Sequence, residues 1–563
     1  MKNVKRFLAC AVVLGIAVIL KFNSVRDDYA LVEEFRGAAL KEDVFYPMMA
    51  QNINETNPLS ALINGEVVEN KSGGLMLDDR LQPIVSIEYI NKYLCASAVR
   101  LTEDSFVVQK SFPIYRMTVG DKQADYFGEK IELNTAPVLI NGQLYMGLQD
   151  LCNFWDYEFD YDINTRIVDI ACSKFAGLPT VYDMRNWDRN PFVRNQGNST
   201  NCWAYASIEA LESSLMPYQT TRLDAEHVIT GNSFGLDEML SGDYTMALAY
   251  LLAWQGPVAE GDEDIMYHLQ EAHFYNADDI DAIKWAVFQY GGVTTSIYAN
   301  LSSVGLSGGT NYNASSNSYC YTGNKEPNHD VLIIGWNDDY PAESFAVDVP
   351  GDGAFICLNS WGEKFGEDGV FYVSYYDANI GNQAVSYVGV EGVDNYDHIY
   401  QSDLCGWTGQ LGYSTKKCYG ANVFTSNQDE EVVAAGFYAL GKNTAYEIYV
   451  VDNFTNTASL GVRRLVGAGV LDDAGYYTIQ FDEPVQVEKG KEFAIIVGLS
   501  TPGNTRPIAI EHRADEYTAN VDLSDGKGYI SKNGLEWEPV SGKIEANLCI
   551  KTYTNDVITE KKK

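Results

Sequence analysis

Apolar positions along the 563-residue chain follow three successive patterns, and each pattern predicts a different kind of structure. In the central part, Ile208, Leu211 and Leu215 recur at spacings of three and four residues, which is typical of the buried face of a helix. Continuous apolar runs at 331–336 and 354–358 then predict two buried strands. The central part is therefore expected to mix helices and strands.

The flanking segments have patterns of their own. Before the central part, the sequence of 62–65 recurs at 139–142, and its Asn-Gly pair between apolar residues is a strong hairpin-turn signal. After residue 394, short strand-like runs at 445–451, 477–481 and 493–497 are separated by turns. This spacing predicts a β-sandwich, which we expect to fold on its own.

The N-terminus combines a basic start with an apolar run. Lys2, Lys5 and Arg6 precede an apolar stretch at 7–20, an arrangement typical of an export signal. This stretch has fourteen residues, which is short for a membrane-spanning helix. A cleaved signal and a retained anchor therefore both stay open, and we expect contact with a membrane only through this segment.

The chain is too long for one domain, and the changes of pattern predict a multidomain α+β protein. The predicted parts are a signal peptide or membrane anchor at 1–22, a spacer at 23–59, a small α+β accessory domain at 60–173, the mixed central domain at 174–394, an all-β sandwich at 395–553 and a charged tail at 554–563.

The composition of the chain excludes some classes of binding partner. A net charge of −37 at pH 7 disfavours binding to nucleic acid, and a hydrophobic content of 46% supplies ample core material. The ten cysteines are scattered and do not show the spacing of zinc ligands. Cys405 and Cys418 are close enough in the sequence to be candidates for a disulfide. We therefore expect no metal at the site of chemistry.

Four residues in the central part supply the groups for nucleophilic attack on an acyl carbon. Cys202 begins the predicted helix, whose positive end lowers the pKa of a thiol. His329, at the start of the first apolar run, can take the proton of the thiol and return it to a leaving amine. Asn359, after the second run, can orient the imidazole, while Gln196 and the backbone N–H of Cys202 can bind an oxyanion.

These segments, in this order, resemble the papain-like cysteine peptidase family. The resemblance covers about 175–392 and lies in Gln-Gly…Cys-Trp-Ala from residue 196, Asn-His-x-Val-x-Ile-x-Gly-Trp from 328 and Asn-Ser-Trp-Gly from 359. It implies a helical half and a barrel-like half. It also implies a Cys202–His329–Asn359 triad, with Gln196 in the oxyanion hole and no cofactor for catalysis.

The resemblance also suggests residues that contact the substrate. Gly242 matches the second glycine of the strip that pairs with extended substrate, and Asn328 and Trp361 flank the triad. Trp361 is expected to shield the Asn359–His329 hydrogen bond from water. One departure from the family is Ser199, which stands where the family usually has a disulfide-bonded cysteine.

Both flanking domains resemble known families. The segment 60–173 is similar to the copper amine oxidase N-terminal-like domain, although it contains no ligand cluster for copper. The segment 395–553 is similar to the lectin-like domain of clostridial surface cysteine peptidases. That second resemblance implies at most calcium and glycan or cell-wall binding, and Asp452, Asp472 and Asp473 are its acidic turn residues.

The sequence thus predicts an exported cysteine endopeptidase that acts on extracellular or cell-surface proteins and peptides. Two alternatives from other classes stay open. One is a cell-wall amidase with a Cys/His pair, and the other is a surface adhesin or cell-wall binding protein whose peptidase domain is inert.

Overall fold

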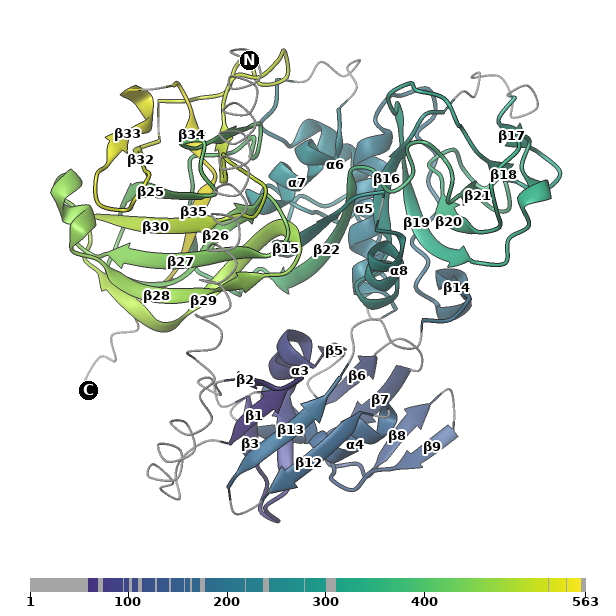
Figure 1. Cartoon of the computed structure of the whole chain (residues 1–563), viewed down its shortest axis with the longest axis horizontal. Coiled ribbons are helices and arrows are strands. Elements are labelled where there is room, and N and C mark those ends of the chain that lie inside the picture. The colour runs from purple at the N-terminus through teal and green to yellow at the C-terminus, as the bar shows by residue number, and fades with distance from the viewer. Residues whose placement is uncertain are drawn as a thin grey trace, which may run out of the picture. The chain divides into compact units, whose positions relative to one another are not determined.

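The structure is a computed structural model (Figure 1). It describes residues 59–557 except 69–73, 95, 101–103, 110–113, 127–128, 141–142, 156, 163–164, 173–177, 218, 236–241, 278, 300–309, 525 and 543. The predicted export segment at 1–22, the spacer except for residue 59, and the tail beyond 557 lie outside the described residues. Within the described part of the chain, every helix is too short or too polar to cross a lipid bilayer.

The chain divides into two compact units. One contains the described residues up to 86 together with 147–172, and the other contains 87–146 together with the chain from 173 onward. This division crosses the predicted accessory domain at 60–173, whose boundaries stay a prediction.

The first unit is built from short strands and one helix. β1 pairs antiparallel with β2 and parallel with β13, and the turn between β1 and β2 is Asn64-Gly65 with positive φ at both residues, as the Asn-Gly pair predicts. Its elements are β1 (Ser60–Ile63), β2 (Glu66–Val68), β3 (Leu75–Leu77), β4 (Pro83–Ser86), α4 (Leu148–Phe154), β12 (Glu158–Asp162) and β13 (Ile167–Ala171).

The second unit begins with a helix and an antiparallel sheet of five strands in sequence order. β10 and β11 then pair as an antiparallel hairpin. These elements are α3 (Ile87–Tyr93), β5 (Ser97–Arg100), β6 (Ser105–Gln109), β7 (Ile114–Thr118), β8 (Gln123–Tyr126), β9 (Glu129–Glu132), β10 (Val138–Ile140) and β11 (Gln143–Gly147).

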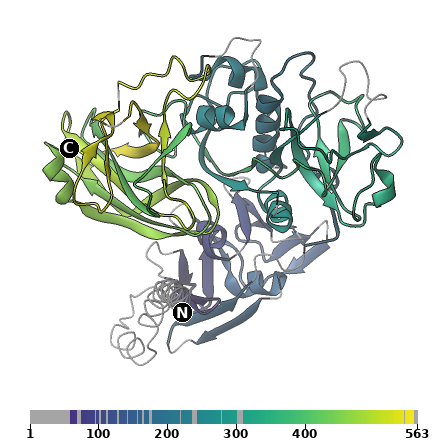
Figure 2. The same cartoon turned by 45° about the horizontal axis from the view of Figure 1, so that its top comes forward.

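From residue 181 the second unit has a helical half and a strand half that lie side by side (Figures 1 and 2). Its helices are α5 (Cys202–Leu215), α6 (Ala225–Thr230), α7 (Tyr244–Leu252) and α8 (Ile280–Gln289), and short 3₁₀ turns lie at Met184–Trp187 and Ala342–Ser344. Its strands are β14 (Val181–Asp183), β15 (Tyr267–Tyr275), β16 (Val293–Ile297), β17 (Tyr312–Asn313), β18 (Ser318–Tyr319), β19 (His329–Asn337), β20 (Ala354–Leu358), β21 (Val370–Ser374) and β22 (Ala384–Gly392).

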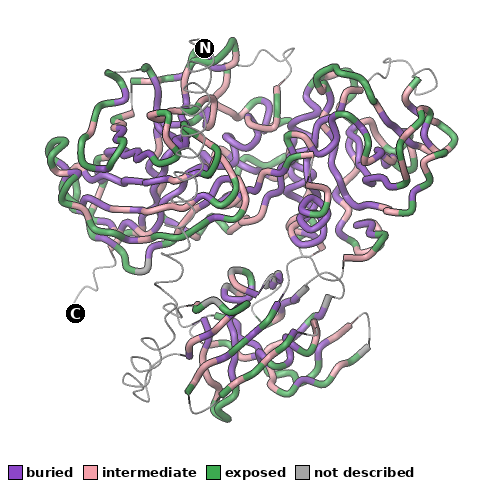
Figure 3. Tube along the Cα trace, in the orientation of Figure 1, coloured by how far each residue is buried: buried purple, intermediate pink, exposed green. Residues whose placement is uncertain are grey.

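α5 is the central helix of these two halves. The sequence predicts one apolar face, but every residue from Cys202 to Ser213 is buried, because α5 packs against α6 and α7 as well as against β19 and β22 (Figure 3). Its polar residues are therefore also buried. Glu212 forms an ion pair with Arg194 at 2.6 Å, with both side chains inaccessible to solvent.

After residue 394 the chain forms a sandwich from a six-stranded sheet, a three-stranded sheet and four strands of a larger sheet that also contains earlier strands. The strands are β23 (His398–Tyr400), β24 (Gly409–Leu411), β25 (Lys417–Thr425), β26 (Glu430–Ala439), β27 (Thr444–Val451), β28 (Arg464–Leu471), β29 (Ala474–Val487), β30 (Glu492–Ser500), β31 (Ile508–Glu511), β32 (Gly528–Ser531), β33 (Glu538–Pro539), β34 (Asn547–Leu548) and β35 (Ile550–Asp556), with 3₁₀ turns at Thr457–Gly461 and Val540–Gly542. Phe437, Ile448 and Ile495, from three of these strands, meet in the core between the sheets.

The sandwich and the preceding domain share one sheet, which the sequence pattern did not predict. β29 pairs antiparallel with β15, so that Glu271 lies opposite Tyr477 and Ala272 opposite Tyr476. We call this pairing of β15 with β29 the seam. Beside it, the hydroxyl of Thr478 donates to the side-chain oxygen of Gln270 at 2.8 Å. The result is a continuous sheet of 13 strands that runs from β17 to β23.

The seam between β15 and β29 leaves no room for a side chain at Gly475. A Cβ placed there would lie 2.2 Å from the backbone oxygen of Ala272, and a backbone atom of a paired strand cannot move aside. We expect Gly475→Ala to lower the free energy of unfolding by about 1–3 kcal/mol, the usual cost of overpacking. The control is Gly461→Ala, because a Cβ at Gly461 meets no atom within 4 Å. Equal melting temperatures of the two variants would contradict the seam.

Candidate active site

The strand register brings His329 and Asn359 together. β19 begins at His329 and pairs antiparallel with β20, where Leu332 lies opposite Leu358, so the residue after β20 returns to the start of β19. The Nε2 atom of His329 lies 2.9 Å from Oδ1 of Asn359. Because an amide oxygen only accepts, His329 must carry its proton on Nε2, which leaves Nδ1 free to accept the proton of a thiol.

Cys202 is the first residue of α5, as predicted, and its thiol lies beside the start of β19. The backbone N–H of Asp330 points at its Sγ atom at 3.4 Å, and the thiol lies 4.0 Å from the backbone oxygen of Thr200. The structure therefore brings Cys202, His329 and Asn359 to one place, although Cys202 and Asn359 are 157 residues apart in the sequence.

Trp361 covers the imidazole. Its ring stacks on that of His329 with centroids 4.6 Å apart and planes 21° apart. An apolar ring over a buried hydrogen bond excludes water, which keeps the His329–Asn359 contact in a medium of low dielectric constant.

Burial disfavours the charged forms of both the Cys202 thiol and the His329 imidazole. It raises the pKa of the Cys202 thiol to about 12, and the nearby carboxylate of Asp330 adds to this shift. Burial lowers the pKa of His329 to about 4. The sequence predicts a thiol pKa lowered by the helix end, but here burial outweighs that effect. Thiolate and imidazolium are therefore expected to form together, by transfer of one proton that leaves the net charge unchanged.

Gln196 is held by residues that follow the triad asparagine. The hydroxyl of Ser360 donates to its side-chain oxygen at 2.5 Å, and its backbone N–H donates to the oxygen of Ser360 at 2.8 Å. Its side-chain nitrogen donates to the oxygen of Ser199 at 2.7 Å, which uses one of two amide hydrogens. Gly197, with φ of +62°, makes the turn that follows. Sequence reasoning missed Ser360, and its place inside the Asn-Ser-Trp-Gly segment was the available signal.

The predicted substrate-contacting residues lie in different surroundings. Gly242 packs on the ring of Trp203, where a Cβ would lie 2.6 Å from the nearest ring atom. The side chain of Asn328 accepts from the backbone N–H of Ala299 at 2.7 Å, so its amide binds this chain's own backbone. Ser241, which precedes Gly242 and matches the first glycine position of the family's strip, lies outside the described residues.

The described cysteines form no disulfide. All eight of them, from Cys152 to Cys549, are free and buried. The expectation that Cys405 and Cys418 might bridge is wrong, because the thiol of Cys405 donates to the oxygen of Ser233 and that of Cys418 to the oxygen of Ser531. The sequence distance that suggested the pair carries no information about separation across a sandwich.

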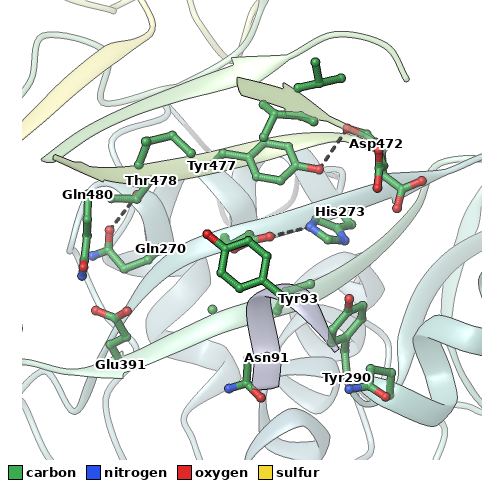
Figure 4. Close-up of a pocket in the computed structure, with 18 of the residues that line it drawn as sticks. Asn91, Tyr93, Gln270, His273, Tyr290, Glu391, Asp472, Tyr477, Thr478 and Gln480 are labelled. Atoms are coloured by element: carbon green, nitrogen blue, oxygen red, sulfur yellow. Dashed lines mark hydrogen bonds and ion pairs between the residues drawn. The ribbon is translucent and has the colours of Figure 1, made fainter. Parts of the chain in front are cut away.

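A hollow that contains no triad residue lies beside the pairing of β15 with β29 (Figure 4). Its volume is about 690 Å³, and Gln270, His273, Glu391, Tyr477 and Gln480 are among the residues that line it. Nδ1 of His273 and the side-chain nitrogen of Gln270 are buried there without a hydrogen-bond partner. Tyrosine rings and amides next to carboxylates are groups that can bind a polar ligand.

The described residues do not gather into an obvious cation site. Nowhere in the described ranges do three or more His, Cys, Asp or Glu side chains come together as a metal ion would require. Asp452 follows β27, and Asp472 and Asp473 form the turn between β28 and β29. Calcium in the sandwich therefore stays a prediction, and no step of the chemistry below depends on it.

The fold and this site together are typical of papain-like folds, with a helical half and a strand half that meet at the Cys202 thiol. Residues 178–388 match the model of the papain family cysteine protease, and residues 399–554 match that of the lectin-like domain. The chain from 178 to 388 is therefore a papain-family cysteine protease domain, and a lectin-like domain follows it. The predicted multidomain fold class is confirmed.

Relatives of known name cover parts of the chain. Cathepsin J of Rattus norvegicus is 29% identical over 215 residues, which are 35% of this chain and 61% of that protein. Cathepsin J of Mus musculus is 27% identical over 242 residues, which are 40% of this chain and 66% of that protein. The chain thus spans less than two thirds of the length of either relative.

Two solved structures have a similar fold over more of the chain. The clostridial cysteine protease Cwp84 after propeptide cleavage has a TM-score of 0.60 at 24% identity and covers 67% of this chain and 99% of its own. The protease and lectin-like domains of Cwp84, a surface layer associated protein of Clostridium difficile, have a TM-score of 0.58 at 23% identity and cover 68% and 90%. At this identity the similarity concerns the fold.

The role of Gln196 can be tested separately from the hydrogen bonds with Ser360 that hold it, which we call the clamp. Gln196→Glu keeps an acceptor for Ser360 but removes the amide donor, so we expect kcat to fall by about 10²–10³, the usual loss for one oxyanion donor. Ser360→Ala removes one hydrogen bond of the clamp and keeps the donor, so its loss should be much smaller. Steady-state kinetics with a short peptide measures both, and equal kcat values for Gln196→Glu and the unchanged protein would show that Gln196 is not a donor.

The free cysteines predict a response to reductant. Because every described cysteine is free, strong dithiothreitol should leave activity intact or raise it, since the thiolate is the reactive form. Activity and melting temperature should be measured with and without reductant. Rapid inactivation by dithiothreitol alone would show that a disulfide supports the site.

Proposed function

We propose that the protein is an exported cysteine endopeptidase that hydrolyses peptide bonds through an acyl-thioester. The observation that carries the proposal is the buried Nε2–Oδ1 contact of His329 with Asn359, next to a helix-start thiol. That contact directs the remaining nitrogen of His329 to act as a base, and Cys202 is the nucleophile that such a base activates.

The steps follow from these positions. Nδ1 of His329 takes the proton of Cys202 as Sγ attacks the carbonyl carbon, and the developing oxyanion accepts from the backbone N–H of Cys202 and the second amide hydrogen of Gln196. When the intermediate collapses, the C–N bond breaks and His329 protonates the leaving amine. Water, deprotonated by the same imidazole, then hydrolyses the thioester and restores the thiol.

The proposed setting is the cell surface or the extracellular space. The basic and apolar start of the chain supports export, and a fold shared with a surface layer associated protease supports a surface role. The substrates are then proteins or peptides met outside the cell. The lectin-like domain would add attachment to glycan or cell-wall ligands, for which the tyrosine- and amide-lined hollow beside β29 is a candidate location.

Labelling of the thiol separates the proposal from its alternatives. A peptidyl epoxide inhibitor should modify Cys202 and no other described cysteine, because the other seven are buried away from the imidazole. Cys202→Ala should abolish both labelling and hydrolysis. Mass spectrometry of the labelled peptide and a casein digest provide the two measurements.

Each alternative predicts a different outcome of these measurements. An inert adhesin would take no label at Cys202. A cell-wall amidase would take the label and release soluble peptidoglycan fragments, but it would leave casein intact. Full peptidase activity in Cys202→Ala would overturn the assignment of the nucleophile.

A further inference from the structure

An acidic side chain lies beside the nucleophile and has no part in the proposed chemistry. Asp330 follows His329 in β19, and its backbone N–H points at Sγ of Cys202 at 3.4 Å. Successive side chains of a strand point to opposite faces, so the carboxylate of Asp330 lies on the other side of the strand from the imidazole. Asp330 is only partly buried.

The carboxylate has a polar partner on one side, and among the described residues it has no cationic partner. The hydroxyl of Ser296 in β16 donates to it at 2.5 Å. Burial raises the pKa of Asp330 to about 7, Ser296 lowers it and Asp243 raises it further. Neither of these two neighbours is a cation. A partly desolvated acid next to a second acid is costly, and a cation brought from outside would relieve that cost.

Two residues of the α7 start lie close to Asp330. Asp243 caps α7 by accepting from the backbone N–H of Thr245 at 2.8 Å, and it is exposed. Tyr244 is partly exposed, and the charges of both Asp243 and Asp330 help to raise the pKa of its hydroxyl. A tyrosine ring near carboxylates can also attract a cation through its face.

The proposed mechanism determines which half of the substrate lies next to Asp330 and Asp243. His329 must lie near the leaving amine in order to protonate it, so the leaving half of the substrate lies on the imidazole side. The acyl half then extends from Cys202 toward Asp330 and Asp243. An extended peptide advances about 3.3 Å per residue, so only its first few residues can reach a carboxylate this close to Sγ.

We propose that Asp330 makes the enzyme selective for substrates with a lysine or arginine among the first three residues on the acyl side of the scissile bond. The proposal rests on the proposed peptidase function and names its substrate class. Asp330 binds the ammonium or guanidinium group, Ser296 fixes the carboxylate, and Asp243 adds attraction at the rim.

The test compares cleavage of a peptide library by the unchanged protein and by Asp330→Asn. In the unchanged protein, lysine and arginine should be enriched at one of the three positions. Matched peptides with lysine or leucine at that position then give a ratio of kcat/KM. The ratio should fall by about tenfold or more in Asp330→Asn, since a charge-assisted hydrogen bond is lost.

The matched control is Asp339→Asn, which removes the same charge beyond the far end of β19. Seven steps along that strand, about 23 Å, lie between Asp330 and the strand's last residue, so the ratio should not change. If Asp330→Asn does not fold, Asp243→Asn tests the same attraction from the exposed rim, and its ratio should fall by a smaller factor.

The pH dependence of the lysine-to-leucine ratio is a second measurement, which a residue with a purely structural role would not affect. The titratable groups around Asp330 are Cys202, His329, Asp243, Tyr244 and Tyr387. Because the raised pKa leaves Asp330 charged above about pH 7 and neutral well below it, the lysine-to-leucine ratio should rise between about pH 5.5 and 8. In Asp330→Asn the ratio should stay flat over this range.

The outcomes separate this inference from the peptidase function itself. If Cys202 takes the epoxide and the library is cleaved without enrichment of lysine or arginine, the inference is wrong and the peptidase function stands. Enrichment that persists in Asp330→Asn would also overturn the inference. If Cys202 takes no label and no peptide is cleaved, the proposed function fails first.

Discussion

The site depends on the antiparallel pairing of β19 with β20. This register places the residue after β20 next to the first residue of β19, and the buried contact between His329 and Asn359 follows from it. β19 is also bonded to β14 and β16, so its position is fixed from both sides. Gly335 is needed in this arrangement, because a Cβ there would lie 2.2 Å from the backbone oxygen of Tyr182 in β14.

The same pairing also fixes Gln196, the proposed oxyanion donor, through the residues that follow β20. Ser360 and Trp361 follow Asn359 directly, and one clamps Gln196 while the other covers His329. An isolated bridge between Asn195 and Trp361 completes the contact of the two segments. The segment from Asn359 to Trp361 therefore orients the base, shields it and holds the donor, which explains why these residues are contiguous in the sequence.

The sequence predicted the elements of the site well, because short-range patterns carry them. The start of α5 at Cys202 and the apolar runs of β19 and β20 appear in the structure where the pattern places them. The shared sheet was not predicted, because the pairing of β15 with β29 joins strands about 200 residues apart and has no local signal. The thiol pKa was predicted in the wrong direction, because burial depends on packing around α5 from several elements.

The seam between β15 and β29 also changes how the lectin-like domain should be regarded. The sequence suggests a self-contained sandwich, yet β29 supplies the neighbour that β15 would otherwise lack on that edge. A strand edge without a partner leaves backbone groups unpaired and invites pairing with another chain. Removal of the sandwich would thus leave the protease domain with an open edge at β15, one strand away from β22, which packs on the nucleophile helix. The lectin-like domain is therefore part of the structural support of the protease domain, whatever ligand it binds.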